Sequence, residues 1–193
     1  MTVTEAVTNS GLTPSAAYAG IEETDDFVFA VQTESTQTKK SDWIVCADHV
    51  REHSGALNAS TSDNTYIRTG PVTTKSHAQR TLTINGDRCP GDQFQDFLLS
   101  HKMLYGTGQS VIVPYLYFSL RTGKGEVGKA AIIVTSDVGG SAGVIATFAA
   151  DVKGIGTPAE FDYTTDAEAC VTRYSLRPHR AEAFLIGEPH EDL

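Results

Sequence analysis

The chain has 193 residues, 40% of them hydrophobic, and a formal net charge of −9 at neutral pH. A chain of this length buries about two-thirds of its unfolded surface in one domain without a metal or disulfide staple. The negative charge argues against a protein that grips nucleic acid, because neutralising phosphates requires clustered Lys and Arg. Three cysteines, Cys46, Cys89 and Cys170, lack CxxC spacing, which indicates buried thiols in a reducing compartment.

The N-terminal stretch, residues 1–25, is rich in Thr, Ser, Ala and Gly and contains no Lys or Arg. It has no sustained apolar period, which predicts an extended arm rather than part of the core. The same composition excludes a secretory signal, and nowhere in the sequence do about 18 apolar residues follow one another. We therefore expect a chain made in the cytoplasm, with no membrane segment.

From Phe27 the pattern changes, and Phe27, Phe29 and Val31 would share one face of a strand predicted over residues 27–31. A second strand is predicted over residues 43–47. Residues 48–78 follow with little hydrophobic content. That segment is too long for an ordinary connection, so it is either a protruding loop or a long hairpin. Residues 79–85 alternate again and stop at Gly86, as a strand entering a turn does.

One helix is predicted over residues 92–103. Asp92 is placed to accept hydrogen bonds from free backbone N–H groups, and Gln95 completes the spacing of a capping box. Four side chains then share one face of the helix: Phe94, Phe97, Leu98 and His101.

The second half of the chain reads as consecutive strands. Residues 110–121 are apolar on both faces, a Gly-rich turn leads to residues 130–136, and alternation resumes from Val144 to Val152. Tight turns between these strands predict an antiparallel meander. The expected fold is mainly β: an antiparallel β-sandwich or barrel over residues 26–161, with one flanking helix, a long protruding loop and extended termini, the last being an acidic extension over residues 162–193.

The sharpest candidate for chemistry is the segment 123–129, which spells GxGxxG through Gly123, Gly125 and Gly128 and nearly forms a phosphate loop with Lys129. Both phosphate-binding motifs need a helix that starts at the loop, whereas the residues after Gly128 favour a strand. Position 130 is Ala, which leaves no hydroxyl for magnesium. The segment therefore predicts a hairpin turn.

Other candidate sites are weaker. Cys46, His49 and His53 offer half of a zinc site without a regularly spaced fourth ligand. The acidic residues of segment 22–26 lie in the arm without an apolar pocket to separate their pKa values, and no nucleophile has an evident base. We expect no catalytic, cofactor-binding or metal-binding residues, and no enzymatic activity.

Taken together, these features resemble the major tail tube proteins of long-tailed bacteriophages, a family related in fold to contractile-tail and type VI secretion tubes. The resemblance covers about residues 26–161 and is one of architecture. It is carried by Trp43 after the first strand, the long polar loop, the helix 92–103, the run Tyr115, Phe118, Arg121, Thr122, Gly123 and Gly128, and the ending Phe148, Val152, Lys153, Gly154 and Pro158.

The resemblance implies two packed antiparallel sheets with a flanking helix, and a subunit that forms hexameric rings stacked into a hollow tube. The implied partners are further copies of the chain, a tape measure protein, and tail terminator and distal tail proteins. Double-stranded DNA would pass through without specific binding, and no membrane or cofactor is involved. The protein would be assembled in the host cytoplasm and reside in the virion.

Mixed charge in the long loop and acidity in the arm suit contacts between subunits. The expected interface residues are therefore Arg51, Glu52, His53, Asp63, Tyr66, Arg68 and Lys75 in the loop, and Glu22, Glu23 and Asp25 in the arm. Three alternatives stay open: another tube or tail-completion component, a ligand-binding β-sandwich, and a nucleotide-dependent enzyme built on the Gly-rich turn.

Overall fold

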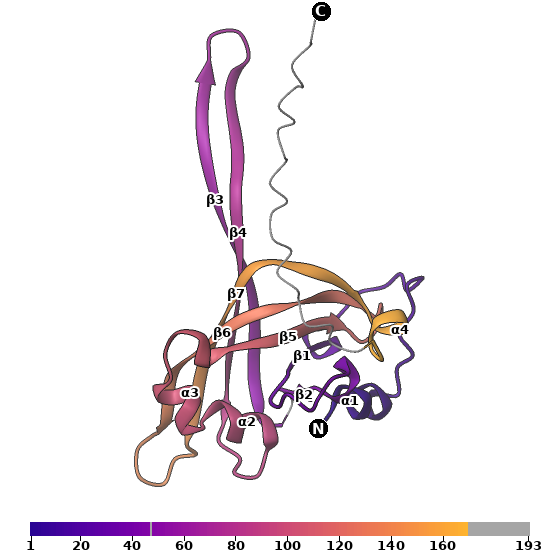
Figure 1. Ribbon diagram of the computed structural model, residues 1–193, viewed down its shortest axis with the longest axis vertical. Coiled ribbons are helices and arrows are strands. Elements are labelled where there is room, and N and C mark those ends of the chain that lie inside the picture. Colours follow the sequence, from indigo (N-terminus) through magenta and orange to yellow (C-terminus); the bar gives the residue numbers. More distant parts are fainter. Residues whose placement is uncertain (47, 170–193) are drawn as a thin grey trace, which may run out of the picture.

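The computed structural model describes residues 1–46 and 48–169, which form a mainly β protein (Figure 1). Seven strands make one antiparallel sheet in the order β2–β1–β5–β6–β7–β4–β3. The strands are β1 (Phe27–Val31), β2 (Ile44–Val45), β3 (Val50–Tyr66), β4 (Gly70–Asp87), β5 (Ile112–Ser119), β6 (Lys124–Gly139) and β7 (Thr147–Asp162). The predicted antiparallel β fold and its β5–β6–β7 meander are confirmed.

The described residues form a single sheet in place of the two packed sheets that the resemblance implies. The reason is the length of β6 and β7, which stay paired with each other from Lys124↔Asp162 to Gly139↔Thr147. The first half of β6, residues 125–131, pairs on its outer side with β5, and the first half of β7, residues 147–153, pairs on its outer side with β4. Register shifts along this pair bend the strands, so two halves of one sheet take the place of two layers.

Side chains on the two faces of the sheet belong to two apolar clusters. One cluster lies under α2 (Gln93–Leu98) and α3 (His101–Tyr105) and includes Phe29, Phe94, Tyr115, Ile132 and Val152. The other lies under α1 (Val3–Ser10) and includes Val28, Trp43, Leu116, Phe118 and Phe161. Strand β5 contributes to both clusters, which confirms the prediction of a strand covered on its two faces.

The predicted extended arm over residues 1–25 is wrong for its first part, which forms α1. Thr2 and Glu5 make a capping box at the start of this helix, and Gly11 ends it with a φ of 65°. Val3 and Ala6 are buried against the sheet. Two buried positions in eight residues give too short an apolar period to recognise in the sequence.

The single helix expected over residues 92–103 is two short helices. Asp92 caps α2 as predicted, because its carboxylate accepts from the Gln95 N–H at 2.8 Å. Ser100 then starts α3 by accepting from the Met103 N–H, which ends the first helical segment. This break turns His101 to solvent, although the spacing placed it on the buried face.

The segment 48–78 is a long hairpin, the second of the two alternatives that the sequence left open. At the other end of the chain, α4 (Tyr163–Asp166) begins the predicted C-terminal extension, and residues 170–193 lie outside the described residues. The start of the extension is docked: Tyr163 stacks on Phe118 with ring centroids 5.7 Å apart, and the Ser41 N–H donates to the Ala167 carbonyl.

The Gly-rich segment 123–129 is the turn between β5 and β6 followed by the start of β6, as predicted, and no helix follows it. Gly125 has a packing role, because a Cβ there would lie 2.1 Å from the Tyr117 carbonyl oxygen. Gly139, at the far end of the same strand, has only Asp137 nearby, 3.6 Å from such a Cβ.

We therefore predict that Gly125→Ala lowers the free energy of unfolding by about 1–3 kcal/mol, since β5 and β6 must move apart. Gly139→Ala is the matched control in the same strand and should change it by less than about 0.5 kcal/mol. Urea denaturation followed by circular dichroism measures both. Equal stability of the two variants would show that the close approach is not needed.

Candidate assembly surfaces

The long hairpin consists of a base within the sheet and a ribbon that stands free of it. Pairing between β4 and β7 ends at Thr81↔Lys153, whereas pairing between β3 and β4 continues to Tyr66↔Gly70. Residues 57–79, the distal ribbon, therefore form a two-stranded structure that projects far beyond the body (Figure 1). An isolated hairpin buries little apolar surface, so its position depends on how its base is held.

The expected interface residues of the loop fall into two separate groups. Asp63, Tyr66, Arg68 and Lys75 lie on the distal ribbon, and all are exposed. Arg51, Glu52 and His53 lie instead at the start of β3, inside the sheet. The sequence placed both groups in one loop because the pairing of β3 with β4 is not visible in composition.

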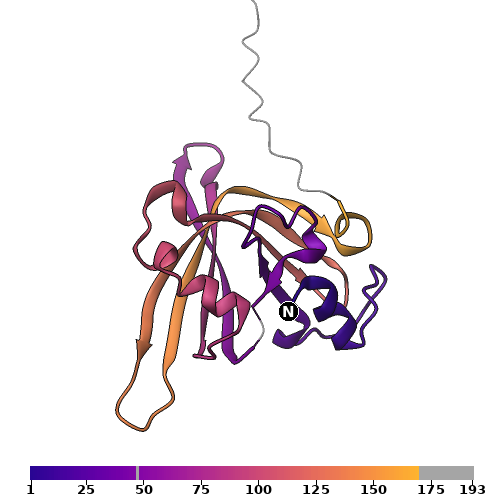
Figure 2. The ribbon, with the colours of Figure 1, turned by 60° about the horizontal axis from the view of Figure 1, so that its bottom comes forward.

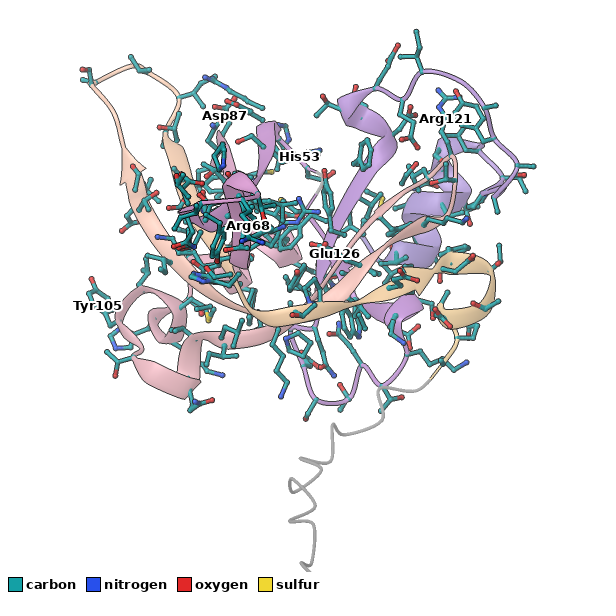
Figure 3. The ribbon with its side chains drawn as sticks, turned by 90° about the horizontal axis from the view of Figure 1, so that it is seen from above. His53, Arg68, Asp87, Tyr105, Arg121 and Glu126 are labelled. Atoms are coloured by element: carbon teal, nitrogen blue, oxygen red, sulfur yellow. The ribbon has the colours of Figure 1, made fainter. Side chains whose placement is uncertain are left out.

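The base of the distal ribbon is held by a polar cluster that the sequence did not reveal. The Arg80 Nε atom on β4 lies 2.6 Å from the Glu126 Oε1 atom on β6, and the Tyr115 hydroxyl donates to the same oxygen at 3.0 Å. The Arg80 guanidinium also stacks over Tyr117, and the His53 ring meets Tyr117 edge-on. Figure 3, which looks down on the ribbon, shows Glu126 near the centre of the body.

The charges in this cluster are partly buried. Only 19% of the Arg80 side chain and 18% of the Glu126 side chain are exposed. The hydrogen bond to Glu126 raises the pKa of Arg80, while burial, together with the negative charge of Glu126, raises the pKa of Tyr115. Gly154 permits the arrangement, since a Cβ there would lie 3.2 Å from the Cβ of Arg80.

The remainder of the arm, residues 11–25, and Asp26, which follows it, are attached to the chain's own β5–β6 turn. Glu22 accepts a hydrogen bond from the Ser119 hydroxyl, and Asp26 forms a 2.7 Å ion pair with Arg121. The guanidinium of Arg121 in turn stacks over Tyr18. Of the expected arm residues, Glu22 is thus engaged within the chain, whereas Glu23 and Asp25 are exposed.

One broad face of the sheet has no covering helix among residues 1–46 and 48–169. It spans β3, β4, β7 and β6, and its side chains alternate with the buried ones of the same strands. Rows of Cα partners across it include Ser54, Thr83, Asp151 and Ile133, then Ala56, Thr81, Lys153 and Ala131. The Thr83 hydroxyl donates to Asp151, and Asn85 donates to Glu52. Short polar side chains thus dominate this uncovered face.

The weaker chemical candidates gain no support from the geometry. Within residues 1–46 and 48–169, no group of three His, Cys, Asp or Glu side chains is placed to hold a metal ion. Cys46 is buried, and that burial raises the pKa of its thiol. Among the same residues, no helix is long and apolar enough to cross a membrane.

Comparison with known proteins gives distant structural likenesses. No family model and no curated protein matches the chain. Chains are similar in the virion of a native gene transfer agent particle (14% identity, TM-score 0.48, covering 72% of this chain and 98% of that one) and in the C6-symmetric tail of an empty gene transfer agent particle (14%, 0.47, 72% and 98%). A third is in the PVC sheath–tube complex of an extracellular contractile injection system (13%, 0.47, 76% and 95%).

Because these identities and TM-scores are low, the chain's own surfaces must indicate its role. Within the described residues, those surfaces are a projecting ribbon, a sheet face without a covering helix, and the edge of β3, which pairs only with β4. All three are suited to contact with other macromolecules.

For the base of the ribbon, we predict that Arg80→Met lowers the free energy of unfolding by about 1–3 kcal/mol, because Glu126 loses its cationic partner in a partly buried site. Arg68→Met, at the exposed end of the ribbon, is the control and should change it by less than about 0.5 kcal/mol. Chemical denaturation measures both, and similar values for the two variants would contradict a role for the cluster.

The ion pair that holds the arm predicts an acid-sensitive contribution to stability. The hydrogen bond from Arg121 lowers the pKa of the Asp26 carboxyl in the folded state. This stabilisation is fully present above the unfolded pKa of about 4 and is lost as the pH falls through the lower folded value. Thermal unfolding from pH 7 to pH 2 should therefore show a shallower acid decline for Asp26→Asn than for wild type, with Asp25→Asn as control.

Proposed function

We propose that the chain is a structural subunit of a phage-type tail tube, in which copies close into hexameric rings and the rings stack around a channel for DNA. The observation that carries the proposal is that two different surfaces occur together in one small protein. A four-stranded sheet face is left open and polar, and a two-stranded ribbon extends from it along the strand direction. The first suits a channel wall, and the second suits a tie between successive rings.

The uncovered face has the chemistry of a wall that DNA slides past. Its side chains are mostly short and polar, and its charges, Glu52, Asp151 and Lys153, have mixed sign. Tight DNA binding needs several phosphates to be neutralised by clustered cations. In a chain of net charge −9, such a wall would offer few binding sites for the phosphates of DNA.

The distal ribbon has the features of a contact between rings. It carries Arg68 and Lys75 against a single acid, Asp63, although the chain as a whole is acidic. Ile67, at its end, is fully exposed, and Leu57 and Tyr66 are more than half exposed. Opposite charge would steer the ribbon onto the acidic body of a copy in the next ring, and the apolar groups would add buried area.

The proposal includes a location and further partners. The protein would reside in the virion tail after assembly in the host cytoplasm. Tail terminator and distal tail proteins would bind the two ends of the tube, and a tape measure protein would occupy the channel before DNA does. A tail-completion protein would stop at a single ring, and electron microscopy of concentrated protein distinguishes single rings from tubes.

The decisive variant removes the ribbon and keeps the sheet. Asn58 and Gln79 are paired across the hairpin, so residues 59–78 can be replaced by an Asn-Gly turn. We expect the shortened protein to keep its circular dichroism spectrum and to form rings, but to form no tubes at concentrations at which wild type does.

A matched control keeps the length of the ribbon and changes only its charge, through Arg68→Ser and Lys75→Ser. These changes should slow tube growth without preventing it, because electrostatic steering acts mainly on the rate of association. Sedimentation and negative-stain microscopy follow both variants. Normal tubes from the shortened protein would contradict the role of the ribbon.

A further inference from the structure

A groove separates the first residues of β3 from α1 on the side of the body away from α3. It has a volume of about 370 Å³. Val28 and Val45 contribute apolar floor, Ala6 and Asn9 of α1 form one wall, and residues 50–53 of β3 form the other. It exists because the sheet curls, which brings its two ends, β2–β1 and β3, towards each other without pairing them.

The groove contains free hydrogen-bonding groups as well as apolar surface. Strand β3 is the last in the sheet, and β4 is its only strand partner among the described residues. Its outward backbone N–H and C=O groups therefore lack a ladder at residues 50–53. An edge of this kind next to an apolar floor is a place where another strand can add to the sheet.

A second exposed element lies at the turn between β6 and β7, residues 136–146, which we call the β6–β7 tip. Its aliphatic side chains Val138, Val144 and Ile145 are 52%, 65% and 61% exposed. They stand among glycines, and Gly140 and Gly143 have positive φ values, so the backbone turns sharply and presents them outward. Exposed aliphatic residues gathered on a projecting turn indicate a contact surface.

The strand that leads to this tip also has a free edge. Pairing between β5 and β6 ends at Ile112↔Ala131, and within residues 48–169 the remainder of β6, residues 132–139, has only β7 as a strand partner. Among the described residues, the sheet thus has two edges without a further strand partner, one at β3 and one at the end of β6, where α3 also contacts β6. Strands alternate in direction across β3, β4, β7 and β6, so the free edges of two copies related by rotation would meet antiparallel.

The tip and the groove lie on different sides of the molecule. Figures 1 and 2 show the β6–β7 tip at one side of the body and α1 with the arm at the other. Two complementary surfaces so placed make a head-to-tail contact, which closes into a ring when the rotation between copies allows it. The only charged residue of the tip is Asp137. It would approach a groove lined by Arg51, whose side chain is 59% exposed and forms a 2.7 Å ion pair with Asp87, and by the acids Asp25 and Glu52.

We propose that the β6–β7 tip of one copy inserts into the groove between α1 and β3 of the next copy, and that this is the lateral contact of the ring. Val144 and Ile145 cover the apolar floor, and β6 extends the sheet along β3. The inference rests on the proposed ring-forming function and assigns its two surfaces. It also gives α1 a role, as the wall that completes the receiving groove.

Disulfide trapping in the full chain tests the contact. In Asn9→Cys/Val144→Cys, mild oxidation should give a ladder of covalent oligomers up to the ring size, with peptide mass spectrometry locating the bond between the two new cysteines. Each single variant is a control. Any oligomers that it forms through the native cysteines, among them Cys46 in the groove lining, are distinguished from the designed bond by the same mass spectrometry. A ladder from Asn9→Cys/Ile67→Cys instead would place the ribbon in the groove and overturn the inference.

A second measurement does not depend on oxidation. Val144→Asp/Ile145→Asp should raise the protein concentration needed for ring formation by more than about tenfold, because burying carboxylates on the apolar floor is unfavourable. Ile155→Asp, another exposed aliphatic position on β7, is the control. Circular dichroism checks that the variants fold.

The outcomes separate this inference from the tube itself. If the wild-type protein forms tubes but the double-cysteine variant gives no ladder, the lateral contact is overturned and the tube proposal stands. The same holds if the wild-type protein forms tubes and the double Asp variant assembles normally. A ladder without tubes would support the contact and contradict the tube. If the double-cysteine variant gives no ladder and the wild-type protein does not assemble, both proposals are refuted.

Discussion

Unpaired backbone at the ends of the sheet is the constraint on which the rest of this molecule depends. An open sheet exposes a row of N–H and C=O groups at each end, and such rows are liable to pair with other chains. At one end, β2 has only two residues, and it is flanked by α1, which is tied to it through the Thr2↔Ile44 bridge. At the other end, β3 is seventeen residues long, and in the described part of the chain β4 is its only strand partner.

This difference between the two ends of the sheet corresponds to where the helices cover it. Helices α2 and α3 cover one face of the sheet, and α1 covers part of the other, so that β1 and β5 are buried on both sides. The covering stops before β4 and β3, which leaves an open edge and an open face next to each other. A protein that functions alone has reason to close such surfaces, whereas a subunit of an assembly has reason to keep them.

Most of the strands were visible in the sequence, either as alternating apolar residues or, in β1 and β5, as nearly continuous apolar runs that are buried on both faces. Phe27–Val31, Leu82 with Ile84, and the double-faced β5 were all visible in this way, and Asp92 was visible as a helix cap. The order of the strands was not visible, since pairing of β4 with β7 joins residues about seventy positions apart. For the same reason the contact of Arg80 with Glu126, and the division of the loop residues into a ribbon group and a base group, required the structure.

The groove and the helix beside it were hidden for a different reason. A helix of eight residues with two buried positions has no period to detect, and its value appears only when the sheet curls beneath it. The aliphatic residues of the β6–β7 tip did carry a signal, as three large apolar groups among glycines. Val138 lies at the end of β6, whereas Val144 and Ile145 were predicted to begin the next strand, which starts only at Thr147.

The ribbon leaves the body at one end only, and this gives every subunit a direction. When such units stack with the same orientation, the resulting filament is polar, with ribbons protruding at one extremity and bare β-sheet bodies at the other. The two extremities then differ in shape and in charge, so a single capping molecule does not fit both. Growth from a starting platform would proceed one way, and the order of assembly would be encoded in the shape of each subunit.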